Sequence, residues 1–166
     1  PYVVVFEPDG QSLSYCTYLG GSLNEQAWGL DFDSQNNLVL GGYMDEYPSV
    51  GDVFQKNCNG LMDNYIAKFD PDGDLLFLTF FGGTKTEYLH KLAIDSHDNI
   101  YFTGQTYSDD YPLKNAYQRK LKSASDTFLS KISSDGTQVL FSTYFGGESS
   151  DFSLSISFTL DDDPII

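Results

Sequence analysis

The sequence predicts an all-β fold that is assembled from a repeated unit. Asp-Gly pairs at 9–10, 72–73 and 135–136 follow one another at intervals of 63 residues. Each pair is followed by an aromatic and apolar run that ends in Gly-Gly. The composition, with 13 Phe and 12 Tyr, is typical of strands joined by tight turns, and no segment shows the period of a long helix.

A hairpin around each Asp-Gly pair is the first element of the unit. In the first copy, residues 2–6 form an apolar run, the turn at 7–10 contains Pro8 and Gly10, and residues 13–19 return as an alternating strand. Proline presets φ, and glycine accepts the positive φ that closes such a turn. The same hairpin is predicted at 65–69 with 75–81 and at 127–132 with 139–145.

A second pair of strands follows each Gly-Gly and its polar connector. In the first copy this pair comprises residues 27–33 and 38–43, joined by a turn at 34–37. Asn and Asp at such turns tolerate the left-handed backbone that a tight hairpin requires. In the second copy the strands are 89–95 and 100–105, joined by a turn at 96–99. In the third copy only the strand at 152–158 is clearly present.

An insertion of about twenty residues separates this second pair from the next hairpin. Its two copies, which include residues 44–55 and 106–118, both contain Tyr-Pro followed by an aromatic residue and Gln. A loop of this length usually folds on itself or carries function. Because the copies match, we expect their aromatic residues and prolines to tuck under the loop as structural plugs.

Four short antiparallel strands in each repeating unit predict a β-propeller. The residues also resemble a known family, the SBBP (seven-bladed β-propeller) repeat. The matching segments are Gly-Gly with a following acid, 28–33, 37–43 and 47–48 in the first copy, 92–96, 99–104 and 110–112 in the second, and 67–69 and 130–132. This resemblance implies that the strand at 28–33 is the innermost one of its blade.

The expected architecture is a partial β-propeller of antiparallel four-stranded blades, a fragment of a larger propeller. It comprises the outer hairpin of a preceding blade at 2–19, blades at 27–81 and 88–145, and the start of a following blade at 152–166. Since propellers use about four to eight blades, we expect either further blades or several chains to complete the ring. The third unit departs from the family pattern, with Thr159 in place of Asp and Pro164 within an expected strand.

The charge balance limits the classes of partner. Nine Lys plus Arg face 24 Asp plus Glu, for a net charge of −15. This charge disfavours nucleic acid and anionic membranes, and no run is long enough for a membrane helix. A solvated surface explains the acids best, and binding of cations or basic partners is the alternative.

The chain offers few parts for catalysis. His90 occupies the place of Trp28 in the preceding repeat, so we expect it to be a packed strand residue, and His97 lies in a turn. No second His or Cys accompanies either in repeat register, so a zinc site or a nucleophile-base pair lacks parts. The segment 70–74 resembles a calcium loop but lacks its bidentate Glu. A hairpin turn explains it, with calcium as the minority alternative and no other cofactor expected.

The two cysteines, Cys16 and Cys58, carry little information. We interpret them as small apolar fillers. A disulfide between them is the alternative in an oxidising compartment.

The candidate binding surface follows from position in a propeller. The connector after Gly-Gly and the long insertion should emerge on the same face, around the channel mouth. There we predict an acidic ring with tyrosines on the neighbouring loops, formed by Asn24, Glu25, Glu87, Glu148, Asp151, Tyr47 and Tyr111. Such a ring suits a cation, a sugar or a basic peptide. The competing interpretation is the solvated rim of a scaffold.

The leading functional hypothesis is a non-enzymatic module for binding, adhesion or display, with a protein or glycan ligand. The family resemblance implies a secreted or cell-surface bacterial protein, carried as cargo by an export or outer-membrane system. The alternative is a propeller-type polysaccharide hydrolase or lyase. An enzyme should break the repeat symmetry with clustered carboxylates or His, whereas here the acids recur in register.

Overall fold

A computed structural model describes residues 1–21 and 24–166. The described residues form twelve strands and no helix. Their bounds are β1 Tyr2–Phe6, β2 Leu13–Tyr18, β3 Glu25–Phe32, β4 Leu38–Met44, β5 Asp63–Phe69, β6 Leu75–Phe81, β7 Glu87–Ile94, β8 Ile100–Thr106, β9 Asp126–Ile132, β10 Val139–Phe145, β11 Ser157–Phe158 and β12 Pro164–Ile165.

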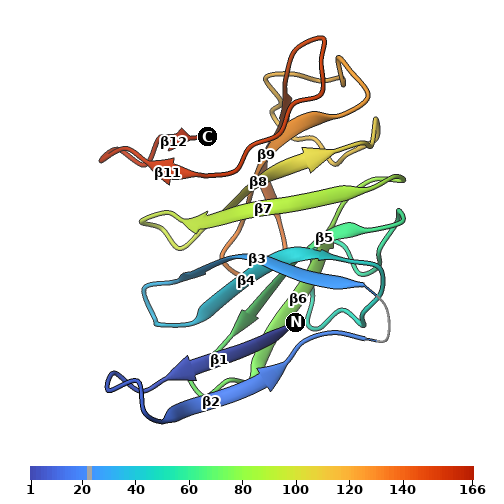
Figure 1. Ribbon diagram of the computed structural model, residues 1–166. Helices are drawn as coiled ribbons and strands as arrows, with labels where there is room; N and C mark the ends of the chain where they lie inside the picture. The colour runs from blue at the N-terminus through green and yellow to red at the C-terminus, as the bar shows by residue number, and fades with distance from the viewer. Residues whose placement is uncertain (22–23) are drawn as a thin grey trace.

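The strands form four antiparallel sheets that lie one above another (Figure 1). Two sheets have four strands, in the orders β3-β4-β5-β6 and β7-β8-β9-β10, and hairpins β1–β2 and β11–β12 lie below and above them. Strands β3 and β7 cross the front of the picture and contact each other between the sheets. This arrangement is a partial β-propeller, as the sequence predicts, with β3 and β7 as the innermost strands of successive blades.

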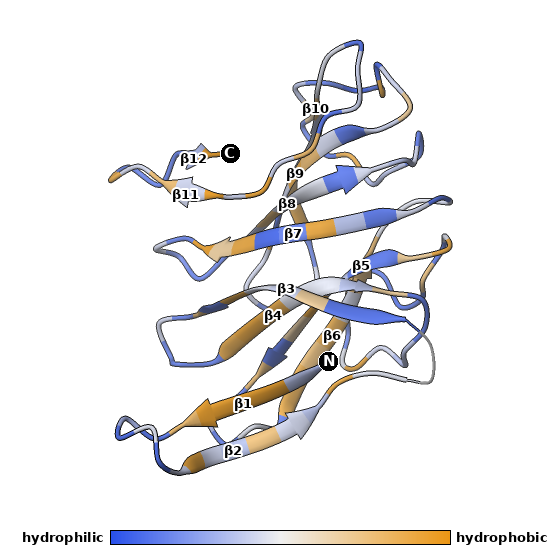
Figure 2. Ribbon diagram, in the orientation of Figure 1, coloured by the Kyte–Doolittle hydropathy of each residue, from blue (hydrophilic) through white to orange (hydrophobic). Residues whose placement is uncertain are grey.

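The core lies between the stacked sheets. The central strand β5 is buried along its whole length, because its two faces pack against different neighbouring sheets. Ile66 joins the cluster toward β7–β10, whereas Tyr65 and Ala67 join the cluster toward β1–β2. Figure 2 shows the hydrophobic character of β1 and β6 and the mixed character of β7. Burial of each large apolar side chain stabilises the fold by roughly 1.5–3 kcal/mol.

The turn between the two inner strands of each blade is built on an aspartate. Asp33 Oδ1 accepts hydrogen bonds from the backbone of Gln35 and Asn37, and its Oδ2 lies 2.6 Å from Lys68 Nζ on β5. Burial opposes ionisation of Asp33, but the hydrogen bonds from Lys68 and Asn37 outweigh it and lower its pKa. Asn36 has φ 63°, which confirms the left-handed backbone predicted for this turn. The Asp33–Lys68 ion pair thus joins this turn to β5, the third strand of the blade.

The second blade repeats this turn, and the third unit varies it. Asp95 pairs with Lys131 at 2.8 Å, and Asp98 has φ 64°. In the third unit, Thr159 Oγ1 accepts the two equivalent backbone hydrogen bonds, at 3.1 and 3.3 Å. Pro164 lies opposite Phe158 in the β11–β12 pair, so a strand does run where proline falls.

The insertions run outward along the outermost strands. Val50 pairs with Leu78 of β6, and Lys114 and Gln118 pair with Ser142 and Tyr144 of β10. These bridges occupy backbone groups that an edge strand would otherwise expose. These parts of the insertions therefore cover the blade edges.

Candidate functional site

The acid in each connector binds the Gly-Gly loop that precedes it. Gly21 donates its backbone N–H to Glu25 at 2.6 Å, Gly83 donates to Glu87 at 3.1 Å, and Gly147 donates to Asp151 at 2.7 Å. Each acid follows its glycine by four residues. Three of the predicted site residues therefore share a structural role, which explains why they recur in register.

Glu87 is the clearest correction to the predicted acidic ring. Its side chain is 0% exposed, and Thr106 Oγ1 donates to it at 2.7 Å. A second buried carboxylate, Asp63, also lies against Gly82, where an added Cβ would collide with both acids. Burial and the neighbouring Asp63 raise the pKa of Glu87 to about 7. The pair locks two blades together and is closed to ligands.

An amide completes this network in both blades. Gln55 Nε2 donates to Asp63 at 2.8 Å, and its Oε1 accepts from Gly82 at 3.2 Å. Gln118 makes the equivalent bonds to Asp126 and to Gly146, at 2.6 and 3.1 Å. The Gln that recurs in both insertions thus fixes the Gly-Gly loop.

Tyr111 is also buried rather than available to a ligand. It is 2% exposed, its hydroxyl lies 3.1 Å from Ser130 Oγ, and its N–H donates to Tyr144. The prediction of a structural plug is confirmed for Tyr111, and its predicted place on the binding surface is wrong. Tyr47 is half-buried against the hydrophobic cluster that lies toward β1–β2, and it borders a hollow of about 500 Å³.

The remaining predicted residues are Asn24 and Glu148, which are both exposed. Asn24 Nδ2 donates to Asp45 Oδ2 at 3.4 Å. Since Glu87 and Tyr111 are buried and the insertions lie along the outer edges, the structure does not bring the seven residues together as a single surface.

The innermost strands carry a feature that the sequence did not predict, a β-bulge in the same place in two blades. In β3 the register shifts between Ala27 and Gly29, and in β7 it shifts between Leu89 and Lys91. The bulged residues are Trp28 and His90. A bulge re-aims a side chain out of the regular alternation of the two sheet faces. Trp28 is accordingly 53% exposed and His90 is half-buried.

The bulged side chains continue into the next unit. The Trp28 and His90 rings lie 6.3 Å apart at 71°, and the His90 and Phe152 rings lie 6.2 Å apart at 88°. His90 Nδ1 lies 2.8 Å from the Ser153 carbonyl. Because a carbonyl only accepts, this contact places a proton on Nδ1, so Nε2 of a neutral ring is the acceptor.

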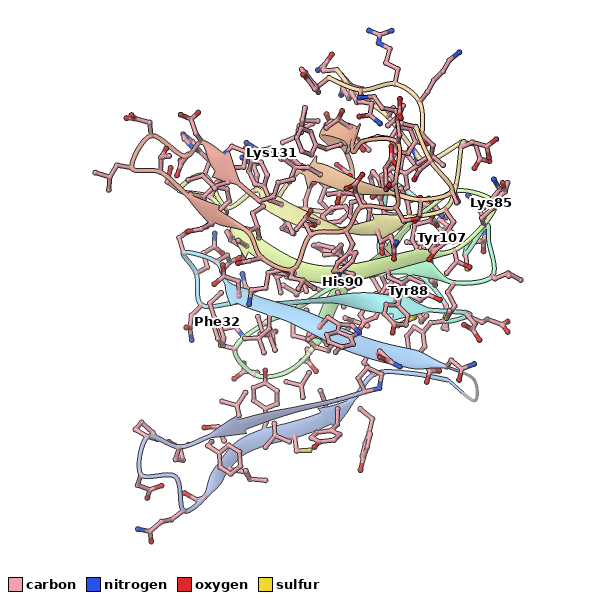
Figure 3. All side chains as sticks on the ribbon, turned by 45° about the horizontal axis from the view of Figure 1, so that its top comes forward. Phe32, Lys85, Tyr88, His90, Tyr107 and Lys131 are labelled. Atoms are coloured by element: carbon pink, nitrogen blue, oxygen red, sulfur yellow. The ribbon has the colours of Figure 1, made fainter. Side chains whose placement is uncertain are left out.

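A tyrosine cluster lies beside this row. Tyr43 and Tyr88 are 4.8 Å apart, Tyr88 and Tyr107 are 6.3 Å apart, and Tyr43 donates to Gln26 Oε1 at 2.8 Å. Figure 3 shows His90 and Tyr88 along β7, with Tyr107 near Tyr88. The "inner wall" hereafter means Trp28, Tyr43, Tyr88, His90, Tyr107 and Phe152.

The charges near the inner wall differ from those of the whole chain. Asp31 of β3 accepts backbone hydrogen bonds from Phe32 at 2.9 Å and from Ile94 at 3.0 Å, so both its oxygens are engaged. Lys91 follows His90 on β7, and Lys85 pairs with Asp109 at 3.1 Å. Among the described residues near the wall, Asp31 thus has a backbone partner on each carboxylate oxygen, and Asp151, beside Phe152, has one from Gly147.

The sequence predicts that His90, in the repeat position of Trp28, is a packed strand residue. The repeated aromatic at that position was the available signal, but its exposure depends on the bulge.

Both cysteines are free, so the disulfide alternative is wrong. Among the described residues, no group of three His, Cys, Asp or Glu could hold a metal ion, and no helix could span a membrane.

Comparison with known proteins agrees with the fold. Residues 81–112 match SBBP, a beta-propeller repeat, and this segment contains the Gly-Gly connector, β7 and β8. The chain is also 26% identical over 102 residues to an uncharacterized WD repeat-containing protein of Acanthamoeba polyphaga mimivirus. That match covers 51% of this chain and 7% of the relative.

Proposed function

We propose that this chain is a non-enzymatic propeller segment that binds a protein or glycan ligand along its inner wall. The observation that carries the proposal is the bulge shared by β3 and β7, which turns Trp28 and His90 out of the packed faces. Exposed aromatic side chains beside a few polar groups are typical of ligand sites. Burying rings in a core would be the ordinary outcome for a strand of a stacked sheet.

The alternative, a propeller hydrolase or lyase, has less support. Such an enzyme needs an acid and a base that reach the substrate. The neighbouring carboxylates Asp63 and Glu87 are buried and hydrogen-bonded within the blade junction. His90 donates to a backbone carbonyl, and no carboxylate is hydrogen-bonded to its ring within the described residues.

No cofactor is part of this proposal. In the segment that resembles a calcium loop, Asp70 Oδ1 accepts hydrogen bonds from the N–H groups of Asp72 and Asp74, at 3.0 and 2.9 Å. This is the bonding of a hairpin turn, and it supports the structural interpretation of the segment.

We place the protein outside the bacterial cell, secreted or at the surface, where it would serve adhesion or display. The support is the resemblance to the SBBP repeat, which implies an exported protein, and the acidic composition, which suits a solvated surface. An export or outer-membrane carrier would then be a partner of the chain.

The single tryptophan makes the binding proposal testable. Trp28 lies on the inner wall, so a bound ligand should shift or quench its fluorescence. The chain would be titrated with a glycan panel and with acidic and basic peptides, and reducing ends would be counted in the same glycan mixtures. Saturable binding without bond cleavage supports the proposal. Release of reducing ends would favour the enzyme, and the absence of a fluorescence change with every ligand tested would refute binding.

A further inference from the structure

We infer that the ligand of the inner wall is a carbohydrate chain that extends across successive blades. This inference rests on the proposed function and names the class of ligand for that site. It starts from the row formed by Trp28, His90 and Phe152, one ring from each of three consecutive units.

The row combines the two chemistries that a sugar presents. A pyranose has apolar C–H faces and a rim of hydroxyl groups, so it pairs with exposed aromatic rings and with a few hydrogen-bonding groups. Trp28 and Phe152 provide the apolar rings, and both are more than half exposed. His90 lies between them and offers Nε2 as an acceptor for a hydroxyl group, since Nδ1 is held by Ser153.

The tyrosine cluster adds a second set of contacts on the same strands. Tyr88 lies two residues before His90 on β7, and Tyr43 contacts it from the preceding blade. Phenol rings supply both an apolar face and a hydroxyl group, which again suits a sugar. Gln26, which accepts from Tyr43, keeps its amide N–H₂ as a donor.

Local charge separates a carbohydrate from a basic peptide, the other ligand that an acidic protein suggests. A Lys- or Arg-rich segment would need free carboxylates near the rings. Asp31 accepts two backbone hydrogen bonds, Asp151 accepts one from Gly147, and Glu87 is buried, so these three carboxylates already have partners or are closed to a ligand. Lys91, next to His90, would repel a cationic segment and tolerate a neutral or acidic sugar.

The blade repeat gives the site its length. Ring centroids follow one another at 6.3 and 6.2 Å across the three units, so a ligand with its own short repeat can contact several of them. Contacts from successive blades add to one binding event, and a longer oligosaccharide should therefore bind more tightly than a monosaccharide.

The test uses the whole chain with hexasaccharides of β-linked glucose, xylose and N-acetylglucosamine, a galacturonate oligomer, the matching monosaccharides and a Lys/Arg peptide. Binding is measured by Trp28 fluorescence and, for every variant, by calorimetry. We expect a hexasaccharide to bind and its monosaccharide to bind at least about tenfold more weakly. His90→Ala and Tyr88→Ala should each weaken binding by about tenfold, and His90→Gln, which can still offer a polar group, should lose less.

Tyr117→Ala is the matched control. Tyr117 is exposed and stacks on Phe145, but it lies in an insertion on the outer edge of β10. Thermal melting of each variant separates a binding loss from unfolding. If a sugar binds and only the control variant weakens it, the assigned site is wrong. If the Lys/Arg peptide binds and no sugar does, the carbohydrate inference falls while the proposed binding function stands. If neither a sugar nor the peptide binds, the carbohydrate inference and the proposed binding function are both wrong.

Discussion

Replacing Glu87 with Gln should stabilise the protein at neutral and higher pH. The carboxylate of Glu87 is buried beside Asp63, and ionisation places a second negative charge in that junction. A glutamine can keep both hydrogen bonds, because its oxygen accepts from Gly83 and its N–H₂ donates to the Thr106 hydroxyl. The substitution therefore removes the charge with little change of shape.

The magnitude follows from the pKa. Burial and Asp63 raise the pKa of Glu87 from 4.5 to about 7. At about 1.36 kcal/mol for each pKa unit, this difference sets a ceiling of about 3 kcal/mol on the free energy of unfolding. The folded protein holds the Glu87 proton more tightly than the unfolded chain does. Its stability therefore falls as pH rises from 4.5 through 7, and the full loss is present above pH 7.

The assay is urea unfolding of wild type and Glu87→Gln across this pH range, with Glu148→Gln as the control at an exposed position. The difference between Glu87→Gln and wild type should grow with pH by up to about 3 kcal/mol and then level off. Carboxylates away from the junction contribute to both curves and cancel in the difference, whereas the titration of Asp63 is part of the difference because its charge interacts with that of Glu87. A difference that stays flat with pH, or that matches Glu148→Gln, would refute the raised pKa of Glu87 in this buried junction.

Three further predictions concern the packing of this junction, the turn between the inner strands and the two cysteines. Gly82→Ala should cost about 1–3 kcal/mol of unfolding free energy in urea unfolding, because its Cβ would collide with two carboxyl groups. Gly147→Ala should cost less, because its Cβ would meet Asp151 Oδ2 at 3.9 Å, an ordinary van der Waals contact. Lys68→Met should lower the free energy of unfolding, measured in urea, by about 3 kcal/mol or more, because it leaves the buried carboxylate of Asp33 without its partner. Cys16 is exposed, whereas burial raises the pKa of Cys58 to about 12, so Cys16 should react with iodoacetamide well before Cys58. Equal rates of modification, measured by mass spectrometry, would contradict the burial of Cys58.

The strands and turns could be predicted because their signals are local. The Asp-Gly turns and the Asn and Asp residues of the inner turns constrain φ within four residues, and Asn36 and Asp98 have the expected left-handed backbone. The inner strands begin earlier than predicted, at Glu25 and Glu87, because these acids pair with Met44 and Thr106 at the far end of the neighbouring strands. An acid in a polar connector gives no local sign of that pairing.

The site could not be predicted to the same extent, because exposure depends on contacts between blades. Glu87 looks like a solvent-facing acid in the sequence, and its burial results from Asp63 and the Gly-Gly loop that close over it. Trp28 and His90 look like core residues, but each lies at a bulge in the pairing with β4 or β8, where His90 is half-buried and Trp28 is 53% exposed. Neither the closure nor the bulge has a signature within a few residues of the side chain it affects.

One position of the inner strand shows the same dependence within a single chain. Leu92 is 1% exposed, because Gly29 of the preceding inner strand packs directly against it. Ile156, one repeat later, is 6% exposed against Tyr101 and Leu129. Leu30 occupies the equivalent place in β3 and is 57% exposed, since no inner strand lies beneath it among the described residues. The repeat thus specifies which side chain is apolar, and the neighbouring blade decides whether it is buried.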